Sequence, residues 1–499
     1  MIDSKAGRAI PNWLLWLTSA LPLLGFWLTG VLDLDEGFYS AAAGEMARRG
    51  EWITPFYNGS PWFEKPILVY WLAIPSINMF GEMVGPRLPS ALCTLLVGYV
   101  VFSYTRRALS ELAAQIALLL YSGSLLVGLV GRSIMTDVPL VTCEIIALFT
   151  FYRSLTEHPK WRLATAAALG LSTLAKGPVG CILFVLAAAL TYWQEPELRP
   201  KFKGYWLLGT VIFAAVVASW YVPAYLVNRQ VFIDKFLIEQ NLKRFTGGDA
   251  AHTVTGLNGI LLYVGVILVG AFPWILCLPQ SWKIRSEHPF LRLCARWSIV
   301  VIAFFMISAA KLPHYVLPAF PTLAIIVGFW MSKQWESKGH PVLDFTVFWR
   351  YALPCLATSA ILNFGIYQYY STGNLFGKQV APPHKEIHDL ARWAKIQQLP
   401  IAVYQMPRRS KALGTGQLKL QETSHPSIAF YAQKPVLMTE SLLEASKLGP
   451  DVVVLTRKGR ITESDVTNLE SANLDLRQVK NAPKSEFYQA WIITQIVQR

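Results

Sequence analysis

Apolar runs long enough to cross a lipid bilayer recur along most of this chain. From Trp13 to Tyr370, stretches of ~20 apolar residues alternate with short polar connectors. The chain is 53% hydrophobic and 15% charged, whereas soluble domains carry roughly 25% charged residues. Each run is typical of a membrane helix. A polytopic α-helical membrane protein is therefore predicted.

The composition changes after Tyr370 to that of an ordinary soluble protein. In the remaining residues, amphipathic helix patterns at 385–398 and 439–448 alternate with strand patterns at 401–405, 451–455 and 487–497. We therefore expect a transmembrane domain over residues 1–370 and a soluble, extracytoplasmic α/β domain over residues 371–499.

The pattern predicts about 11 transmembrane helices. The first run, 13–32, follows Lys5 and Arg8 but lacks a clear cleavage site, so we interpret it as an uncleaved span. In the first outer loop, 35–49 and 66–80 are predicted to be interfacial helices. The other spans are expected at 88–105, 113–130, 139–155, 161–176, 178–193, 205–226, 259–278, 293–310, 314–332 and 346–370.

Lysine and arginine concentrate in the connectors 106–112, 156–160, 194–203, 281–292 and 333–345. The positive-inside rule keeps such loops cytoplasmic. This places the first loop, 33–86, and the soluble tail on the outer face. It also explains the net charge of +14 without a nucleic-acid partner.

Neither cysteine nor histidine indicates a metal site. All six cysteines lie inside apolar runs, and the histidines lack ligand spacing. Scattered acids signal a divalent ion only weakly. We predict no cofactor, and a divalent metal stays an open alternative that the sequence does not indicate.

Charged residues of the outer loops gather in short motifs beside the membrane. Near hydrocarbon, such groups cost several kcal/mol unless they are paired or functional. The loops contain Asp33, Asp35, Glu36, Glu64, Lys65, Arg132, Asp137, Lys176, Arg244, Lys311 and Tyr315. Their gathering at one face favours a site that activates an acceptor and holds an anionic lipid head.

Six motifs carry a resemblance to a known family. They are Leu34-Asp-Glu-Gly-Phe-Tyr39, Phe63-Glu-Lys-Pro66, Arg87-Leu-Pro-Ser90, Thr136-Asp-Val-Pro139, Leu174-Ala-Lys-Gly-Pro178 and Lys311-Leu-Pro-His-Tyr315. In their order and spacing, the chain resembles the C-type glycosyltransferases of the dolichyl-phosphate-mannose protein mannosyltransferase superfamily. Within it, the chain is most similar to bacterial lipid A 4-amino-4-deoxy-L-arabinose transferases. In place of Phe38, those relatives usually carry an arginine.

The resemblance implies inverting transfer of a sugar from a polyprenyl-monophosphate donor. The acceptor would be a lipid, a glycan or a protein at the outer face of a bacterial inner membrane. Asp35 would be the catalytic carboxylate, joined by Asp137 and Glu36. The substrate-binding residues would be Lys65, Glu64, Tyr315, Lys311, Arg244 and Tyr39.

Elementary chemistry agrees with these roles. Inversion is a single displacement at the anomeric carbon, so one carboxylate can take the acceptor proton. The leaving lipid phosphate needs a cation beside it more than it needs a general acid. Asp35 and Lys65 fit these two roles.

Simpler interpretations remain for each residue. Asp33, Asp35 and Glu36 could only favour a helix dipole, and Asp137 could be a turn residue. Glu64 and Lys65 could form an interfacial ion pair worth under ~1 kcal/mol. A transporter or lipid flippase is the main alternative for the whole chain, but we find no internal repeat.

Overall fold

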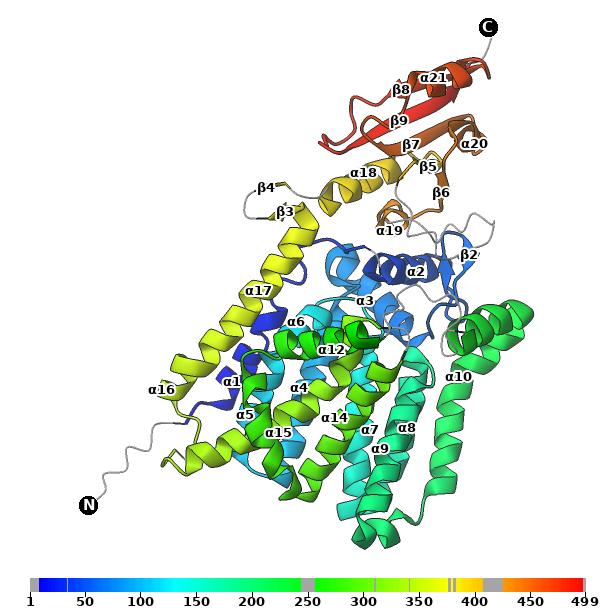
Figure 1. Cartoon of the computed structure of the whole chain (residues 1–499). Helices are drawn as coiled ribbons and strands as arrows, with labels where there is room; N and C mark the ends of the chain where they lie inside the picture. Colours follow the sequence, from blue (N-terminus) through cyan, green and yellow to red (C-terminus); the bar gives the residue numbers. More distant parts are fainter. Residues whose placement is uncertain are drawn as a thin grey trace. The chain divides into compact units, whose positions relative to one another are not determined.

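The computed structural model describes residues 9–33, 35–243, 256–308, 311–340, 342–375, 378–379, 383–406 and 425–496 (Figure 1). The chain divides into two compact units. One unit contains Met1–Phe26, Phe63–Val69 and Leu88–Phe364, and the other contains Trp27–Trp62, Tyr70–Arg87 and Gly365–Arg499.

The first unit is a helical bundle. Its centre is α7, which packs against α4, α8 and the short 3₁₀ helix η6, while α5 packs against α15. Bulky side chains such as Phe149 and Trp297 are fully buried in its core. The main elements are α1 (Asn12–Ser19), α4 (Leu88–Ala108), α5 (Glu111–Ser122), α6 (Leu125–Gly131), α7 (Asp137–Thr156), α8 (Trp161–Lys176), α9 (Val179–Gln194), α10 (Trp206–Phe232), α12 (Gly256–Gly270), α14 (Pro289–Ile307), η6 (Pro313–Ala319) and α15 (Phe320–Glu336).

Several of these helices are suited to a bilayer. Among the described residues, five helices are long and apolar enough to cross a membrane, or up to seven if each of two bent pairs forms one span. The five are α4, α7, α14, α10 with its extension to Phe236, and η6 with α15. The protein is thus an integral membrane protein of mainly helical structure. The count of about 11 stays a prediction.

The first predicted span, 13–32, is not one helix. Helix α1 ends at Ser19, and a 3₁₀ turn, η1 (Leu21–Leu23), follows it. Pro22 lacks a backbone donor, and Gly25 has a φ of 77°, so neither residue continues a helix. Apolar composition extends through the segment, but helical geometry does not.

The second unit contains a five-stranded mixed sheet. Strand order is β6-β5-β7-β9-β8, with β5 parallel to β6 and β7, and with β9 antiparallel to β7 and β8 (Figure 1). The strands are β5 (Ile401–Tyr404), β6 (Val436–Thr439), β7 (Asp451–Arg457), β8 (Leu474–Gln478) and β9 (Tyr488–Gln495). The helices of this part are α18 (His384–Ile396), α19 (Ser427–Ala432), α20 (Leu442–Ser446) and α21 (Glu463–Glu470).

Elements from the first loop pack into this second unit. Helix α2 (Asp35–Arg49) packs against α19, and a hairpin of β1 (Phe56–Tyr57) and β2 (Ser60–Pro61) follows it. Asn58 and Gly59 turn this hairpin with positive φ, as a two-residue hairpin loop requires. The Asn58 amide exchanges two hydrogen bonds with the backbone of Val436. The Asn58 side chain thereby satisfies the backbone N–H and C=O of Val436, the first residue of the edge strand β6.

Candidate functional site

In the first unit, the ends of two helices meet at an ion pair. Asp137 begins α7, and Lys176 ends α8. Lys176 Nζ donates to Asp137 Oδ1 at 2.5 Å. Directly after Lys176, Gly177 adopts a φ of 78°, which lets the chain reverse into α9. An acid at a helix start and a base at a helix end also suit the helix dipoles.

Helix η6 adds two rings to this pair. His314 Nε2 lies 3.5 Å from Asp137 Oδ2. The Tyr315 ring centroid lies 4.1 Å from Lys176 Nζ, within the range of a cation–π contact. Residues from α7, α8 and η6 therefore converge on one carboxylate.

Lys65 belongs to the same surroundings. It lies with Glu64 in a bend before α3 (Leu68–Val84), and both residues are partly exposed. The positive charge of Lys65 is near enough to favour the charged form of Asp137, less strongly than the charges of Lys176 and His314 do. We call Asp137, Lys176, His314, Tyr315 and Lys65 the Asp137 cluster.

Burial makes the pairing in this cluster necessary. The side chains of Lys176 and Asp137 are 13% and 6% exposed. Removing an isolated ion from water costs several kcal/mol, which close pairing offsets. The ammonium group of Lys176 and the imidazole of His314 face a single carboxylate, and the Tyr315 ring packs against the ammonium group. Such a donor set suits an anion that carries several oxygens, such as a phosphate.

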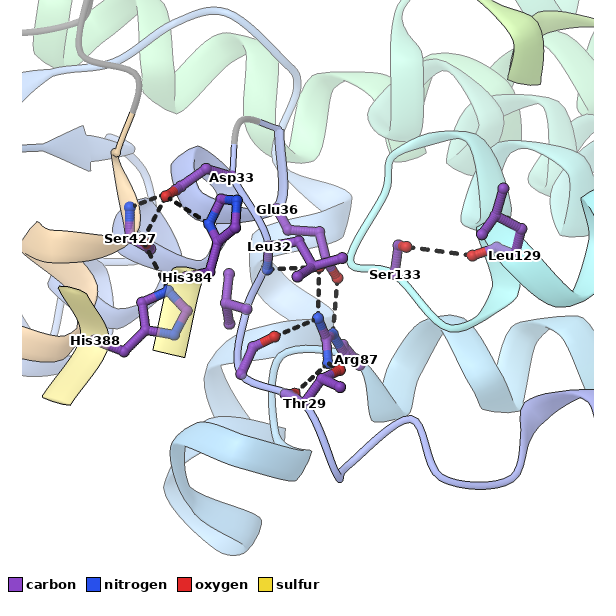
Figure 2. A network of polar contacts seen from close by, with 12 residues as sticks. Thr29, Leu32, Asp33, Glu36, Arg87, Leu129, Ser133, His384, His388 and Ser427 are labelled. Atoms are coloured by element: carbon purple, nitrogen blue, oxygen red, sulfur yellow. Dashed lines mark hydrogen bonds and ion pairs between the residues drawn. The ribbon is translucent and has the colours of Figure 1, made fainter. Parts of the chain in front are cut away.

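In the second unit, Glu36 anchors the start of α2. Arg87 holds Glu36 through two contacts, Nε to Oε1 at 2.8 Å and Nη2 to Oε2 at 2.6 Å (Figure 2). The Leu32 amide also donates to Glu36 Oε2. Arg87 donates in addition to the carbonyls of Thr29 and Gly30. Both Glu36 oxygens are thus engaged, which favours a positioning role over the predicted catalytic role.

Asp35 precedes Glu36 and is the first residue of α2. It is half-buried. Within the part of the chain that the structure describes, its carboxylate has no hydrogen bond or ion pair. A carboxylate in this condition can accept a proton from an incoming hydroxyl without first losing a partner.

Asp33 lies in a second polar network of this unit. Its carboxylate accepts hydrogen bonds from the Ser427 amide and hydroxyl at 2.9 and 2.8 Å, and it contacts His384 (Figure 2). It also contacts His425. Burial alone would raise the pKa of Asp33, but these two imidazoles outweigh it and hold that pKa well below its usual range. His388 reaches the Ser427 hydroxyl at 3.2 Å. We call Asp33, His384, His388, His425 and Ser427 the Asp33 cluster.

Comparison with known proteins adds to this geometry. Residues 64–221 match the family model described as dolichyl-phosphate-mannose-protein mannosyltransferase. An uncharacterized protein of Aquifex aeolicus is 30% identical over 70% of this chain and 76% of its own length. The undecaprenyl phosphate-alpha-4-amino-4-deoxy-L-arabinose arabinosyl transferase of Pectobacterium carotovorum is 31% identical over 62% of this chain and 56% of its own length.

The fold agrees with these matches. The crystal structure of ArnT from Cupriavidus metallidurans bound to undecaprenyl phosphate superposes with a TM-score of 0.73 at 18% identity. The alignment covers 96% of this chain and 98% of that one. The chain belongs to the protein mannosyltransferase superfamily of glycosyltransferases.

The resemblance predicted from the six motifs is therefore confirmed. The chain spans only 53% to 60% of the length of the curated arabinosyl transferases named in these matches. None of the names of these relatives is that of a transporter.

The structure brings some of the predicted site residues together. Asp137, Lys65 and Tyr315 share the Asp137 cluster. Lys311 is buried, and its amine donates to the carbonyl of Ser308 at the end of α14, a contact typical of a helix C-terminus.

Two further predicted site residues lie outside the Asp137 cluster or outside the described residues. Tyr39 is buried and packs edge-on against Tyr70 at 6.4 Å. Arg244 lies outside the described residues. The roles assigned to the predicted site residues all stay predictions.

The sequence reasoning left other residues without a role. The sequence motifs predict no partner for Lys176, Arg87 or His314, and each of them has one in the structure. The statement that the histidines lack ligand spacing is wrong for one pair. His384 and His388 stand four residues apart on α18, a spacing that puts two side chains on one helix face.

Proposed function

We propose that this protein transfers a sugar, with inversion, from a polyprenyl-monophosphate donor to a lipid acceptor at the outer face of a bacterial inner membrane. The observation that carries the proposal is the Asp137 cluster. There, Lys176 and His314 face one buried carboxylate at the start of α7, and the Tyr315 ring packs against Lys176. Such a group can hold a lipid phosphate where the bilayer meets water.

In this proposal the donor phosphate meets Lys65 and Lys176. As the bond from the anomeric carbon to the phosphate oxygen breaks, negative charge grows on the phosphate, and nearby lysines stabilise it. Asp137 keeps Lys176 and His314 in place, because both of its oxygens face these side chains. Asp137 is thereby a positioning residue. The donor phosphate supplies the second negative partner for the lysines.

Asp35 is proposed as the base. It would accept the proton of the acceptor hydroxyl while that oxygen forms the new bond to the anomeric carbon. Glu36 and Arg87 support this role because they fix the helix start on which Asp35 stands. The transition state is expected to be oxocarbenium-like, as in other glycosyl chemistry.

The finer architecture belongs to the same proposal. We propose a transmembrane domain over 1–370 with about 11 spans and an outer α/β domain over 371–499. Glu64, Tyr315, Lys311, Arg244 and Tyr39 remain proposed substrate contacts. A glycan or protein acceptor is the alternative to a lipid.

The test is genetic and chemical. Lipids and glycoconjugates from a strain that lacks the protein are compared by mass spectrometry with those of the parent strain. We expect one glycoconjugate to lose a sugar residue. Wild-type protein should restore the sugar, and Asp35→Asn should not, although it accumulates in the membrane to the same level.

The matched control is Asp475→Asn, which alters a partly exposed tail aspartate and should restore the sugar fully. Full restoration by Asp35→Asn would remove Asp35 as the base. An unchanged glycoconjugate profile in the deletion strain would overturn the proposed function itself.

A further inference from the structure

The Asp33 cluster gathers four side chains that metal ions commonly use as ligands. Asp33 precedes α2, His384 and His388 lie on the first turns of α18, and His425 precedes α19. All four belong to the second unit. Asp33, His384 and His388 each offer one ligand atom, and these atoms lie within 4.8 Å of one another.

The distances at Asp33 match the geometry of a tetrahedral ion. Zinc binds carboxylate oxygen and imidazole nitrogen at about 2.0–2.1 Å, so two ligand atoms of a tetrahedral site lie about 3.3 Å apart. Asp33 Oδ2 lies 3.2 Å from His425 Nδ1 and 3.4 Å from His384 Nδ1. These two separations match two edges of such a tetrahedron.

The surrounding residues hold the imidazoles in place. The His388 ring packs against the Tyr431 ring at 4.4 Å between centroids, with the two planes tilted by 37°. A Cβ atom at Gly30 would lie 2.7 Å from His388 Nδ1, so glycine is needed for this close approach. The Tyr488 hydroxyl lies 3.5 Å from His425 Nε2. Partners of this kind orient the imidazole ligands of metal sites.

We propose that Asp33, His384 and His425, with His388 as the fourth ligand, bind one Zn²⁺ ion. Three imidazoles and one carboxylate suit zinc, whereas magnesium and calcium prefer oxygen ligands alone. A set of four protein ligands is typical of a structural zinc site. The His384 side chain is 18% exposed, which gives the ion a path from solvent.

The ion would join three segments that are far apart in sequence. Asp33 is 392 residues from His425 in the chain, and His384 lies on a third segment. A cross-link between these segments would fix Asp33, which stands two positions before Asp35 in the chain. The zinc site is independent of the proposed function, because it requires no role for Asp35.

A hydrogen-bonded network without metal is the competing explanation. Asp33 also accepts hydrogen bonds from the amide and hydroxyl of Ser427, and those bonds need no ion. The two explanations differ in metal content, which can be measured directly.

The experiment uses the full-length protein, purified in detergent without a polyhistidine tag. After incubation with Zn²⁺ and removal of free metal, elemental analysis should find about one zinc per chain. His384→Asn and His425→Asn should each lower zinc affinity at least tenfold. His340→Asn, which alters an exposed histidine beside Asp344, should bind zinc like the wild type.

Two measurements on the wild type alone keep the test decisive if a variant fails to fold. A strong chelator should lower Tm, and Zn²⁺ should restore it. Co²⁺ in place of Zn²⁺ should give the intense visible absorption of a tetrahedral site. Wild-type protein that binds no zinc, and whose Tm neither chelator nor Zn²⁺ changes, would establish the hydrogen-bonded network and overturn the proposal.

Discussion

Single residues in the Asp137 cluster each have more than one partner. Lys176 faces both the Asp137 carboxylate and the Tyr315 ring, and Asp137 faces both Lys176 and His314. Charge in a partly buried site is thereby spread over several contacts. A phosphate that enters such a site exchanges partners with groups that already point inward, which lowers the reorganisation needed for binding.

Phe38 stands where the related transferases usually carry an arginine. The resemblance indicates that an arginine is missing at this position. The structure shows what replaces it: Phe38 is 2% exposed, stacks on Trp62 at 5.0 Å and meets Tyr57 edge-on at 5.1 Å. The charge is absent because the position has become part of an aromatic core, which no local pattern reveals.

Lys65 gives the first residue-scale prediction. Lys65→Ala should raise the KM for the lipid-phosphate donor roughly 10- to 100-fold, because a hydrogen bond to a charged group contributes about 1.5–3 kcal/mol. The kcat at saturating donor should change less. Steady-state kinetics with purified enzyme and a synthetic polyprenyl-phosphate sugar measures both values.

Lys160→Ala is the matched control, since Lys160 is an exposed lysine in a connector predicted to be cytoplasmic. It should leave both kinetic constants unchanged. An unaltered donor KM in Lys65→Ala would exclude Lys65 from phosphate binding.

At the scale of elements, α2 was predicted with the same bounds that it has in the structure. Acids at its start and Arg48-Arg49 at its end fit the helix dipole, so the signal is local and strong. The first span failed for the opposite reason. Its apolar composition is continuous, but Pro22 and Gly25 interrupt the helix.

Long-range partners of these elements could not be predicted. The Asn58 amide meets Val436 across 378 residues, and Arg87 meets Glu36 across 51. The sequence shows that such side chains are polar, but it does not show which distant backbone group will need them. The i,i+4 spacing of His384 and His388 was visible, whereas Asp33 as their common neighbour was not.

The start of α2 gives the element-scale prediction. Glu36→Gln leaves the Arg87 guanidinium buried without its counter-charge, which costs about 3–5 kcal/mol. Hydrogen exchange of amides in 29–40 should therefore become faster by a factor that corresponds to this loss of local stability. Hydrogen exchange with mass spectrometry on the purified protein measures it.

Glu82→Gln provides the comparison. Glu82 pairs with Arg392 at 2.6 Å, a distance like that of the buried pair, but the two side chains are 31% and 33% exposed. Water screens such a pair, so its loss should cost under ~1 kcal/mol. Equal effects of the two substitutions would show that burial does not govern the strength of the Glu36–Arg87 pair.

At the scale of the whole molecule, the sequence expected a boundary at residues 370 and 371. That boundary stays a prediction. The compact units of the structure group Trp27–Trp62 and Tyr70–Arg87 with the residues from Gly365 onward. Composition separates membrane from soluble segments, but it does not show that an outer loop packs with a distant tail. The contacts between α2 and α19 and between Asn58 and Val436 account for the grouping.

Orientation in the membrane is the whole-molecule prediction that follows from charge. If lysine and arginine keep 333–345 in the cytoplasm, the tail lies outside. In a background without native cysteines, Lys458→Cys in the tail should react with a membrane-impermeant maleimide in intact spheroplasts. Lys338→Cys should react only after the membrane is permeabilised. Both lysines are exposed, so accessibility within the protein does not bias the comparison.

The two labelled cysteines also distinguish a wrong number of membrane spans from a wrong orientation in the membrane. An even number of spans between the two positions would make both cysteines react under the same condition. A reversed orientation would exchange their behaviour. In the predicted pattern, the tail and the loop that carries Asp35 lie on the same, outer side, because Asn58 ties that loop to β6 within one unit.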